Sequence, residues 1–164
     1  MAKKGSKDRT PSDRTVVATN RRARRDYEIL DTVEAGMVLR GSEVKSLRDR
    51  NVQMADSYAR IENGEMWVHG LHISPWSHSS AFTGHDPDRP RKLLLHRSQI
   101  DRLGSRVDQE RLTLVPLSIY FRQGRAKLEL ALARGRRSYD KRQVIARRDA
   151  DREAERAMAR HRRR

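Results

Sequence analysis

The sequence predicts a mainly β protein: a small closed antiparallel barrel with two or three short helices and a flexible basic C-terminal tail. The large apolar residues fall almost entirely within residues 19–133, in short segments that alternate as strands do. Turn residues separate these segments at short intervals. As an open sheet, five or six such strands would leave exposed edges, which barrel closure removes. We expect a barrel of the oligonucleotide-binding kind, and a sandwich remains an alternative.

Composition divides the chain into three zones. Residues 1–18 are polar and basic, so we expect a flexible N-terminal arm. Residues 19–133 form the predicted barrel domain. Residues 134–164 contain 13 Lys/Arg and five Asp/Glu, a net charge of +8. This basic tail has few bulky apolar residues, so we expect it to be disordered alone and helical only when bound.

The first predicted strands cover residues 28–34 and 37–39, with a tight turn at Ala35-Gly36. A short helix should begin at Gly41-Ser42, because Val44 and Leu47 then form an apolar stripe. The next pair of strands, 58–61 and 66–68, flanks Asn63-Gly64. Asn-Gly is a strong hairpin signal, because both central residues of the turn require positive φ.

A loop after Pro75 precedes the predicted helix that carries Ile100, Leu103 and Val107, with Ser98 as its N-cap. Residues 112–121 form the next strand, in which Pro116 interrupts the ladder and predicts a bulge or an edge. Gln123-Gly124 should turn the chain. The final strand carries Leu128, Leu130 and Leu132 on one face.

The chain carries a formal net charge of +15 and a sequence pI of about 11.2, so a polyanion is the expected partner. There are no cysteines, which excludes disulfides and thiolate metal sites. We expect a cytoplasmic protein and no membrane partner, because no apolar run approaches the roughly 20 residues of a membrane helix. Binding to an anionic membrane surface is a weaker interpretation.

No catalytic, metal or cofactor site is expected. His69 and His72 would lie on opposite faces of one strand, which argues against zinc. No glycine-rich nucleotide loop is present. A nuclease would need an acid–base pair, for which His85 and Asp86 are the residues to test.

Several motifs resemble the small protein B (SsrA-binding protein) family, and the resemblance covers about residues 16–160. The motifs, in the family's order, are NRRARRDY at 20–27, EAG at 34–36, GSEVKSLR at 41–48, DSYA at 56–59, RKLLL at 91–95 and ARGRRSYDKR at 133–142. Each motif alone is weak, but their order, the chain length and the basic tail together are specific.

The resemblance implies a noncatalytic role in ribosome rescue. The barrel would bind the tRNA-like domain of transfer-messenger RNA, and elongation factor Tu would deliver the complex through the RNA. The tail would enter the empty mRNA channel of the stalled ribosome near the decoding centre. The nascent peptide would then be tagged for degradation. We expect a monomer by default.

The RNA-binding residues that the resemblance and the charge pattern imply lie in the barrel domain and at its end. They are Asn20, Arg22, Tyr27, Glu34, Lys45, Arg48, Lys92, Leu94, His96, Lys127 and Arg134. Without the resemblance, Lys45 and Arg48 read as a solvated basic face, Tyr27 as a packing residue and Leu94 as core. His96 stands where many members have Asn, and only His changes its charge near pH 6.5.

The expected ribosome-binding residues of the tail are Arg136, Arg137, Tyr139, Asp140, Lys141, Arg142 and Met158. Tyr139 and Asp140 argue against a purely electrostatic tail, because neither is needed to bind phosphates. Ala157 stands where many members carry a bulkier aliphatic residue. The alternative function is a general or structural ribosome-associated RNA-binding protein, which needs the basic charge but no preference for the tRNA-like domain.

Overall fold

The computed structural model describes residues 13–78 and 84–162, of which residues 138 and 139 are described by their backbone alone. The strands are β1 (Arg14–Thr19), β2 (Tyr27–Met37), β3 (Val52–Gln53), β4 (Tyr58–Glu62), β5 (Glu65–His69), β6 (His72–Ile73), β7 (Arg91–Leu94), β8 (Thr113–Arg122) and β9 (Arg125–Gly135). The helices are α1 (Arg21–Asp26), α2 (Gly41–Arg48), α3 (Arg97–Glu110) and α4 (Ser138–Arg162).

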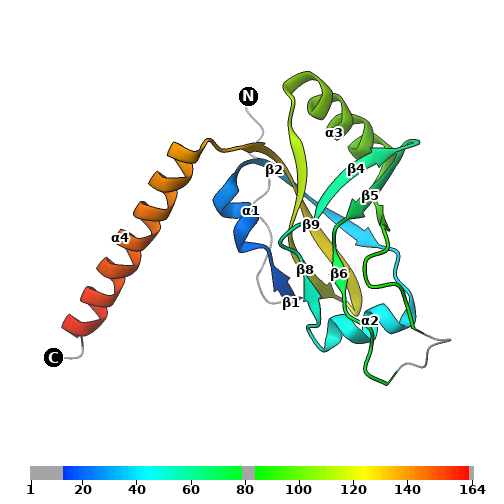
Figure 1. Ribbon diagram of the computed structural model, residues 1–164, viewed down its shortest axis with the longest axis horizontal. Coiled ribbons are helices and arrows are strands. Elements are labelled where there is room, and N and C mark those ends of the chain that lie inside the picture. Colours follow the sequence, from blue (N-terminus) through cyan, green and yellow to red (C-terminus); the bar gives the residue numbers. More distant parts are fainter. Residues whose placement is uncertain (1–12, 79–83, 163–164) are drawn as a thin grey trace, which may run out of the picture.

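The main sheet has the order β1-β8-β4-β5-β7-β2-β9, and β9 pairs again with β8. This second pairing closes the sheet into an antiparallel ring, to which β1 adds along β8 (Figure 1). The predicted closed antiparallel barrel with short helices is confirmed. Strands β3 and β6 form a separate small ribbon.

The barrel interior is filled by inward-facing aliphatic side chains from the ring strands. Helices α2 and α3 lie at opposite ends of the barrel and each adds a leucine to this core, Leu47 and Leu103 (Figure 1). Complete burial of such a side chain stabilises the fold by about 1.5–3 kcal/mol. Helix α1 packs Ala23 against a second cluster on the outside of β8 and β9, where Ala131 and Ala133 leave room for it.

Two turns and one bulge that were predicted from local sequence signals are confirmed. Asn63 and Gly64 have φ values of 51° and 75°, and they join β4 to β5 as the predicted hairpin. The register of β8 against β9 shifts between Pro116 and Ser118, which is the predicted bulge. The predicted turn at Gln123-Gly124 is also present, since Arg122 pairs with Arg125.

The predicted turn at Ala35-Gly36 is wrong, because β2 continues through both residues to Met37. Gly36 pairs with Leu94 on β7 and with Lys127 on β9. A Cβ on Gly36 would lie 3.2 Å from the Cβ of Leu94. The glycine therefore permits close approach of β7 and does not reverse the chain.

The expected N-terminal arm is shorter than residues 1–18. Residues 1–12 lie outside the described part, but Arg14–Thr19 form β1 and pair with residues 118–122 of β8. Val17 joins the core at 9% exposure. The sequence did not predict this strand, because its pairing partner lies about 100 residues away along the chain.

The N-cap of one helix differs from the prediction. Helix α3 begins at Arg97, and its N-cap is His96 in place of the predicted Ser98. The backbone N–H of His96 donates to Gln99 Oε1 at 3.0 Å. Helix α4 is continuous over the tail, in agreement with its content of Ala, Arg and Glu, which are acceptable helix formers. The ordering of this helix by a partner stays a prediction.

Candidate RNA interface

A groove of about 580 Å³ on the outside of the barrel brings together four of the predicted RNA-binding residues, Glu34, Leu94, His96 and Lys127. Strand β2 lies between β7 and β9, and Gly36 pairs with Leu94 on one side and Lys127 on the other. This register brings together residues that lie up to 93 positions apart in the sequence. The rest of the lining is Thr32, Val33, Gly36, Leu95, Gln99 and Arg102.

Leu94 supplies an apolar surface within this groove. Its neighbour Leu93 points into the core at 1% exposure, whereas Leu94 points outward and is 54% exposed. The alternation of side chains along β7 accounts for this difference. An exposed leucine among polar side chains offers a contact for the flat face of a base or a ribose.

Glu34 organises the positive charge beside the groove. Its Oε2 accepts a hydrogen bond from the hydroxyl of Tyr120 and one from Arg122 at 3.4 Å, and Arg14 lies at 3.7 Å. Burial raises the pKa of Glu34, but the hydrogen bond from Tyr120 and the charges of Arg122 and Lys127 outweigh it, so the pKa lies below its ordinary value. Glu34 therefore stays ionised and holds two arginines at the edge of the groove.

The other end of the groove carries hydrogen-bond donors and one imidazole ring. The side chain of His96 is exposed at the start of α3. Arg102, one of the lining residues, forms an ion pair with Asp31 at 3.4 Å. Together with Lys127 these side chains can reach phosphates or base edges, which is the chemistry that recognition of folded RNA requires.

Lys45 and Arg48 are exposed on α2, while Leu47 points into the core. Lys45 Nζ lies 4.2 Å from the ring centroid of Trp76, and the guanidinium of Arg48 lies 4.6 Å from that of Phe121. These cation–π contacts hold both charges at the surface in defined positions. The two residues form a basic face, as predicted, and they lie outside the groove lining.

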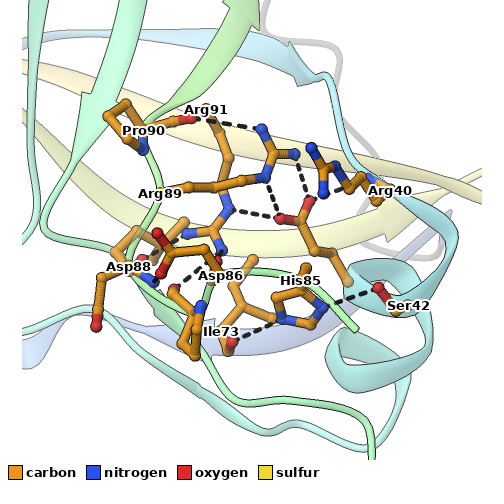
Figure 2. A network of polar contacts seen from close by, with 12 residues as sticks. Arg40, Ser42, Ile73, His85, Asp86, Asp88, Arg89, Pro90 and Arg91 are labelled. Atoms are coloured by element: carbon orange, nitrogen blue, oxygen red, sulfur yellow. Dashed lines mark hydrogen bonds and ion pairs between the residues drawn. The ribbon is translucent and has the colours of Figure 1, made fainter. Parts of the chain in front are cut away.

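A buried ionic network joins α2 to residues 89–91 (Figure 2). Glu43, in the first turn of α2, is completely buried, and so is Arg91. The Glu43 carboxylate accepts hydrogen bonds from Arg89 at 2.5 and 2.8 Å, from Arg91 at 3.2 Å and from the backbone N–H of Arg40 at 3.0 Å. Arg91 also donates to the carbonyl of Leu71 at 2.5 Å.

This network has two consequences for the interface. Burial raises the pKa of Glu43, but hydrogen bonds from Arg89 and the backbone of Arg40, with the charges of Arg91 and Arg89, outweigh it and lower the pKa. The ionised carboxylate therefore fastens α2 to the segment that leads into β7. The position of Lys45 and Arg48 is thereby tied to that of the groove.

Asn20 has a structural role in place of the predicted RNA contact. It is 3% exposed and caps α1, where its Oδ1 accepts from the backbone N–H of Ala23 at 3.1 Å. Its Nδ2 donates to the carbonyls of Met54 and Pro116, at 3.1 and 3.0 Å. All of these hydrogen bonds lie inside the protein, so the Asn20 side chain is not available to RNA.

Arg22 and Tyr27 line a smaller hollow of about 240 Å³ between α1 and β4. Arg22 is exposed and pairs with Asp56 at 3.0 Å and Asp26 at 3.5 Å. Tyr27 is half-buried against the cluster below α1, in agreement with its interpretation as a packing residue. Lys92 lies on β7 and pairs with Glu65 at 3.0 Å.

The predicted tail residues begin at a third hollow, of about 540 Å³, where β9 leads into α4. Arg134, Arg136, Arg137 and Asp140 line it. The backbone N–H of Arg136 donates to the carbonyl of Asp26 at 2.8 Å, which fixes the point where the chain leaves the barrel.

Beyond that point the contacts to the barrel are few. Lys141 reaches Asp26 at 3.9 Å, and Arg148 donates to the carbonyl of Arg24 at 3.4 Å. Arg142 and Met158 are exposed. The side chain of Tyr139 lies outside the described residues.

Four residues that surround Glu34 or line the groove were not predicted from the sequence: Arg14, Tyr120, Arg122 and Arg102. Arg14 stood in the expected arm, and the partners of Tyr120 and Arg122 depend on strand register. One feature of the sequence pointed to this cluster. Arg122 and Arg125 flank the turn at Gln123-Gly124, and like charges paired across two strands are destabilising unless a carboxylate lies nearby. Glu43 lies within the motif GSEVKSLR, but the sequence predicts no role for it, because the motif does not reveal that the side chain is buried.

The described geometry gives no support for the nuclease site or the metal site that the sequence raised as alternatives. His85 is buried, with Nδ1 2.9 Å from Ser42 Oγ and Nε2 2.8 Å from the carbonyl of Ile73 (Figure 2). Both its ring nitrogens are thus engaged within the protein. Over residues 13–78 and 84–162, no group of three or more acidic or histidine side chains is arranged to hold a metal ion. In the same ranges no helix is long and apolar enough to span a membrane.

Comparison with known proteins gives a consistent result. The chain is 54% identical to the SsrA-binding protein of Thermobifida fusca (strain YX) over 162 residues, which cover 99% of this chain and 100% of that protein. It is 54% identical to the SsrA-binding protein of Mycolicibacterium smegmatis, with 94% and 96% of the two chains covered.

A solved structure described as "tmRNA-SmpB: a journey to the center of the bacterial ribosome" contains a chain with the same fold. The TM-score is 0.63 at 49% identity, with 78% of this chain and 93% of that chain covered. A family model described as SmpB protein matches residues 17–160. The chain therefore belongs to the SmpB protein family.

Proposed function

We propose that the protein binds the tRNA-like domain of transfer-messenger RNA and brings it to stalled ribosomes for rescue and tagging of the nascent peptide. The observation that carries the proposal is its 54% identity, over nearly its whole length, to proteins called SsrA-binding protein. This function is noncatalytic and takes place in the cytoplasm. It needs no cofactor, and elongation factor Tu participates only through the RNA.

The groove supports the proposal because it combines the groups that folded RNA requires. Leu94 supplies an apolar surface, Lys127 and Arg102 supply cations, and Glu34 supplies a carboxylate that can accept from a 2′-hydroxyl or a base amine. We propose that the tRNA-like domain lies along this groove and that Lys45 and Arg48 contact its phosphates. A monomer suffices for this, because the groove is formed within one chain.

The tail supports the second half of the proposal. Its described side chains are exposed from Ile145 to Arg162, so their charge is available to a polyanion. We propose that Arg136, Arg137, Asp140, Lys141 and Arg142 contact the ribosome near the decoding centre and that α4 enters the empty mRNA channel. Met158 would make an apolar contact near the far end, and Tyr139 would stack on a ribosomal base.

Competition at physiological salt tests the proposal. Labelled tRNA-like domain is bound to the protein and displaced with unlabelled tRNA-like domain or with an ordinary tRNA of equal length. We expect at least about a hundredfold preference for the tRNA-like domain, which corresponds to about 2.7 kcal/mol. Equal affinity would favour the alternative, a general ribosome-associated RNA-binding protein that binds by charge alone.

A further inference from the structure

The outer face of the hairpin β4–β5, together with β7, carries aromatic side chains that the proposed function does not use, beside two cations, of which Lys92 is an expected RNA-binding residue. Ala59, Met66 and Val68 point into the core. Because side chains alternate along a strand, their neighbours point outward. We call these neighbours the outer strip: Tyr58, Arg60, Trp67, His69 and Lys92.

The strand register places Trp67 between two cations. It pairs with Arg60 on β4 and with Lys92 on β7. Beside them, Tyr58 pairs with His69, and their rings stack with centroids 5.4 Å apart and planes inclined by 15°. Tyr58 is 42% exposed, so the stack is open to solvent on one side.

The charges of the outer strip are already balanced within the protein. Arg60 pairs with Glu62 at 2.6 Å, and Lys92 pairs with Glu65 at 3.0 Å. His69 also contacts Glu62, at 2.9 Å. Binding of phosphates to these cations should therefore be weak. The flat faces of the rings, in contrast, offer a contact that does not depend on net charge.

The outer strip adjoins the groove. Lys92 and Leu94 lie two positions apart on β7 and point to the same side, and Leu94 lines the groove. A nucleic-acid chain that leaves the groove past Leu94 meets Lys92 and then Trp67. Base–aromatic stacking is the usual way in which proteins bind unpaired nucleotides.

We propose that the outer strip is a stacking platform for unpaired bases of RNA, with Trp67 as its principal ring and the Tyr58–His69 stack beside it. This inference rests on the proposed function, because the groove must hold the folded part of the same RNA. It adds a separate contact, which binds single-stranded nucleotides through their bases.

Tryptophan fluorescence gives a direct test, because the chain has two tryptophans, Trp67 and Trp76. The full-length variant Trp76→Phe leaves Trp67 as the reporter, and Trp67→Phe is the matched control that leaves Trp76. Each is titrated at physiological salt with a twelve-residue oligoadenylate and with a blunt RNA duplex of equal length. We expect the oligoadenylate to quench Trp67 and the duplex to leave it nearly unchanged.

Affinity supplies the second readout. Trp67→Ala should weaken oligoadenylate binding roughly 5- to 150-fold, the equivalent of one stacked base, while Trp67→Phe retains a ring and stays near the wild type. The slope of log affinity against log salt should not change, because no phosphate contact is removed. Thermal melting of each variant shows whether the barrel is intact.

The outcomes separate the two proposals. An unquenched Trp67 and an unchanged affinity of Trp67→Ala would overturn the stacking platform, even if the tRNA-like domain is preferred over tRNA. Loss of ribosome binding by Trp67→Ala with unchanged RNA affinity would also overturn it, and would indicate a protein partner. Quenching without a preference for the tRNA-like domain would keep the platform and reject the proposed function.

Discussion

Helix α2 and helix α4 use the same charged residue types in opposite ways. In α2, Glu43 is fully buried and hydrogen-bonded to Arg89 and Arg91 (Figure 2). In α4, the one ion pair that the described residues show within the helix joins Arg152 and Asp149 at 3.9 Å, with both side chains more than 60% exposed. Charges that are matched inside the protein position structural elements, whereas exposed and unmatched charges remain available to a polyanion.

The largest expected effect on stability comes from the buried ionic network around Glu43. Glu43→Ala should lower the free energy of unfolding by about 3–5 kcal/mol, because it leaves buried Arg91 without its carboxylate partner. Chemical denaturation monitored by circular dichroism measures the change. The matched control is Glu110→Ala, which removes an exposed helical carboxylate paired with Arg106 and should change stability little. Equal effects of the two variants would contradict a structural role for the network.

The pH dependence of stability tests the contribution of the ionised Glu43 carboxylate. The pKa of Glu43 in the folded protein lies below its ordinary value. Its stabilising contribution is therefore complete above the unfolded-state pKa and is lost as the pH falls through the lower folded-state pKa. The stability difference between wild type and Glu43→Gln should be constant near neutral pH and shrink in acid. Denaturation curves between pH 3 and 7 measure it, and a difference that grows in acid would be contrary to expectation.

Removal of the exposed helix should have a much smaller effect on stability. A chain that ends at Arg137 keeps the hydrogen bond between Arg136 and Asp26, and it loses the weak contacts of Lys141 and Arg148. We expect a loss of about 1 kcal/mol at most, with binding of the tRNA-like domain largely intact. Tagging on stalled ribosomes should be abolished. Normal tagging by the shortened chain would reject the proposed role of the tail.

The smallest change in stability is expected on the exposed side of α2. Lys45→Ala and Arg48→Ala each remove one cation–π contact, so about 0.5 kcal/mol should be lost per variant. If each residue contacts a phosphate, the slope of log affinity against log salt falls by about one unit per variant. Filter binding across a salt series measures the slope. Unchanged affinity and slope would leave both residues as solvated charge.

The sequence predicted those parts of the fold that depend on neighbouring residues. The turn at Asn63-Gly64 and the bulge at Pro116 follow from local backbone preferences, and both are present. Strand β1 was missed because its partner, β8, lies about 100 residues away in the sequence. Gly36 was read as a turn, although its missing side chain serves the approach of Leu94 from another strand.

The sequence likewise predicted part of the candidate site and missed the part that depends on distant strands. The resemblance named Glu34, Leu94 and His96, the basic charge pattern added Lys127, and the structure brings all four into one groove. It could not tell that Asn20 is enclosed by backbone groups, because that depends on how α1 meets β8. Nor could it reveal the outer strip, since the neighbours of Trp67 come from two other strands.

The attachment of α4 has a mechanical consequence. The helix contains 25 residues, which span about 37 Å at 1.5 Å per residue. It leaves the barrel next to the hydrogen bond between Arg136 and Asp26 and projects away from it (Figure 1). In this helical form the tail places its tip at a set distance from the barrel. Adding or removing one helical turn would move the tip by about 5.4 Å without altering the barrel.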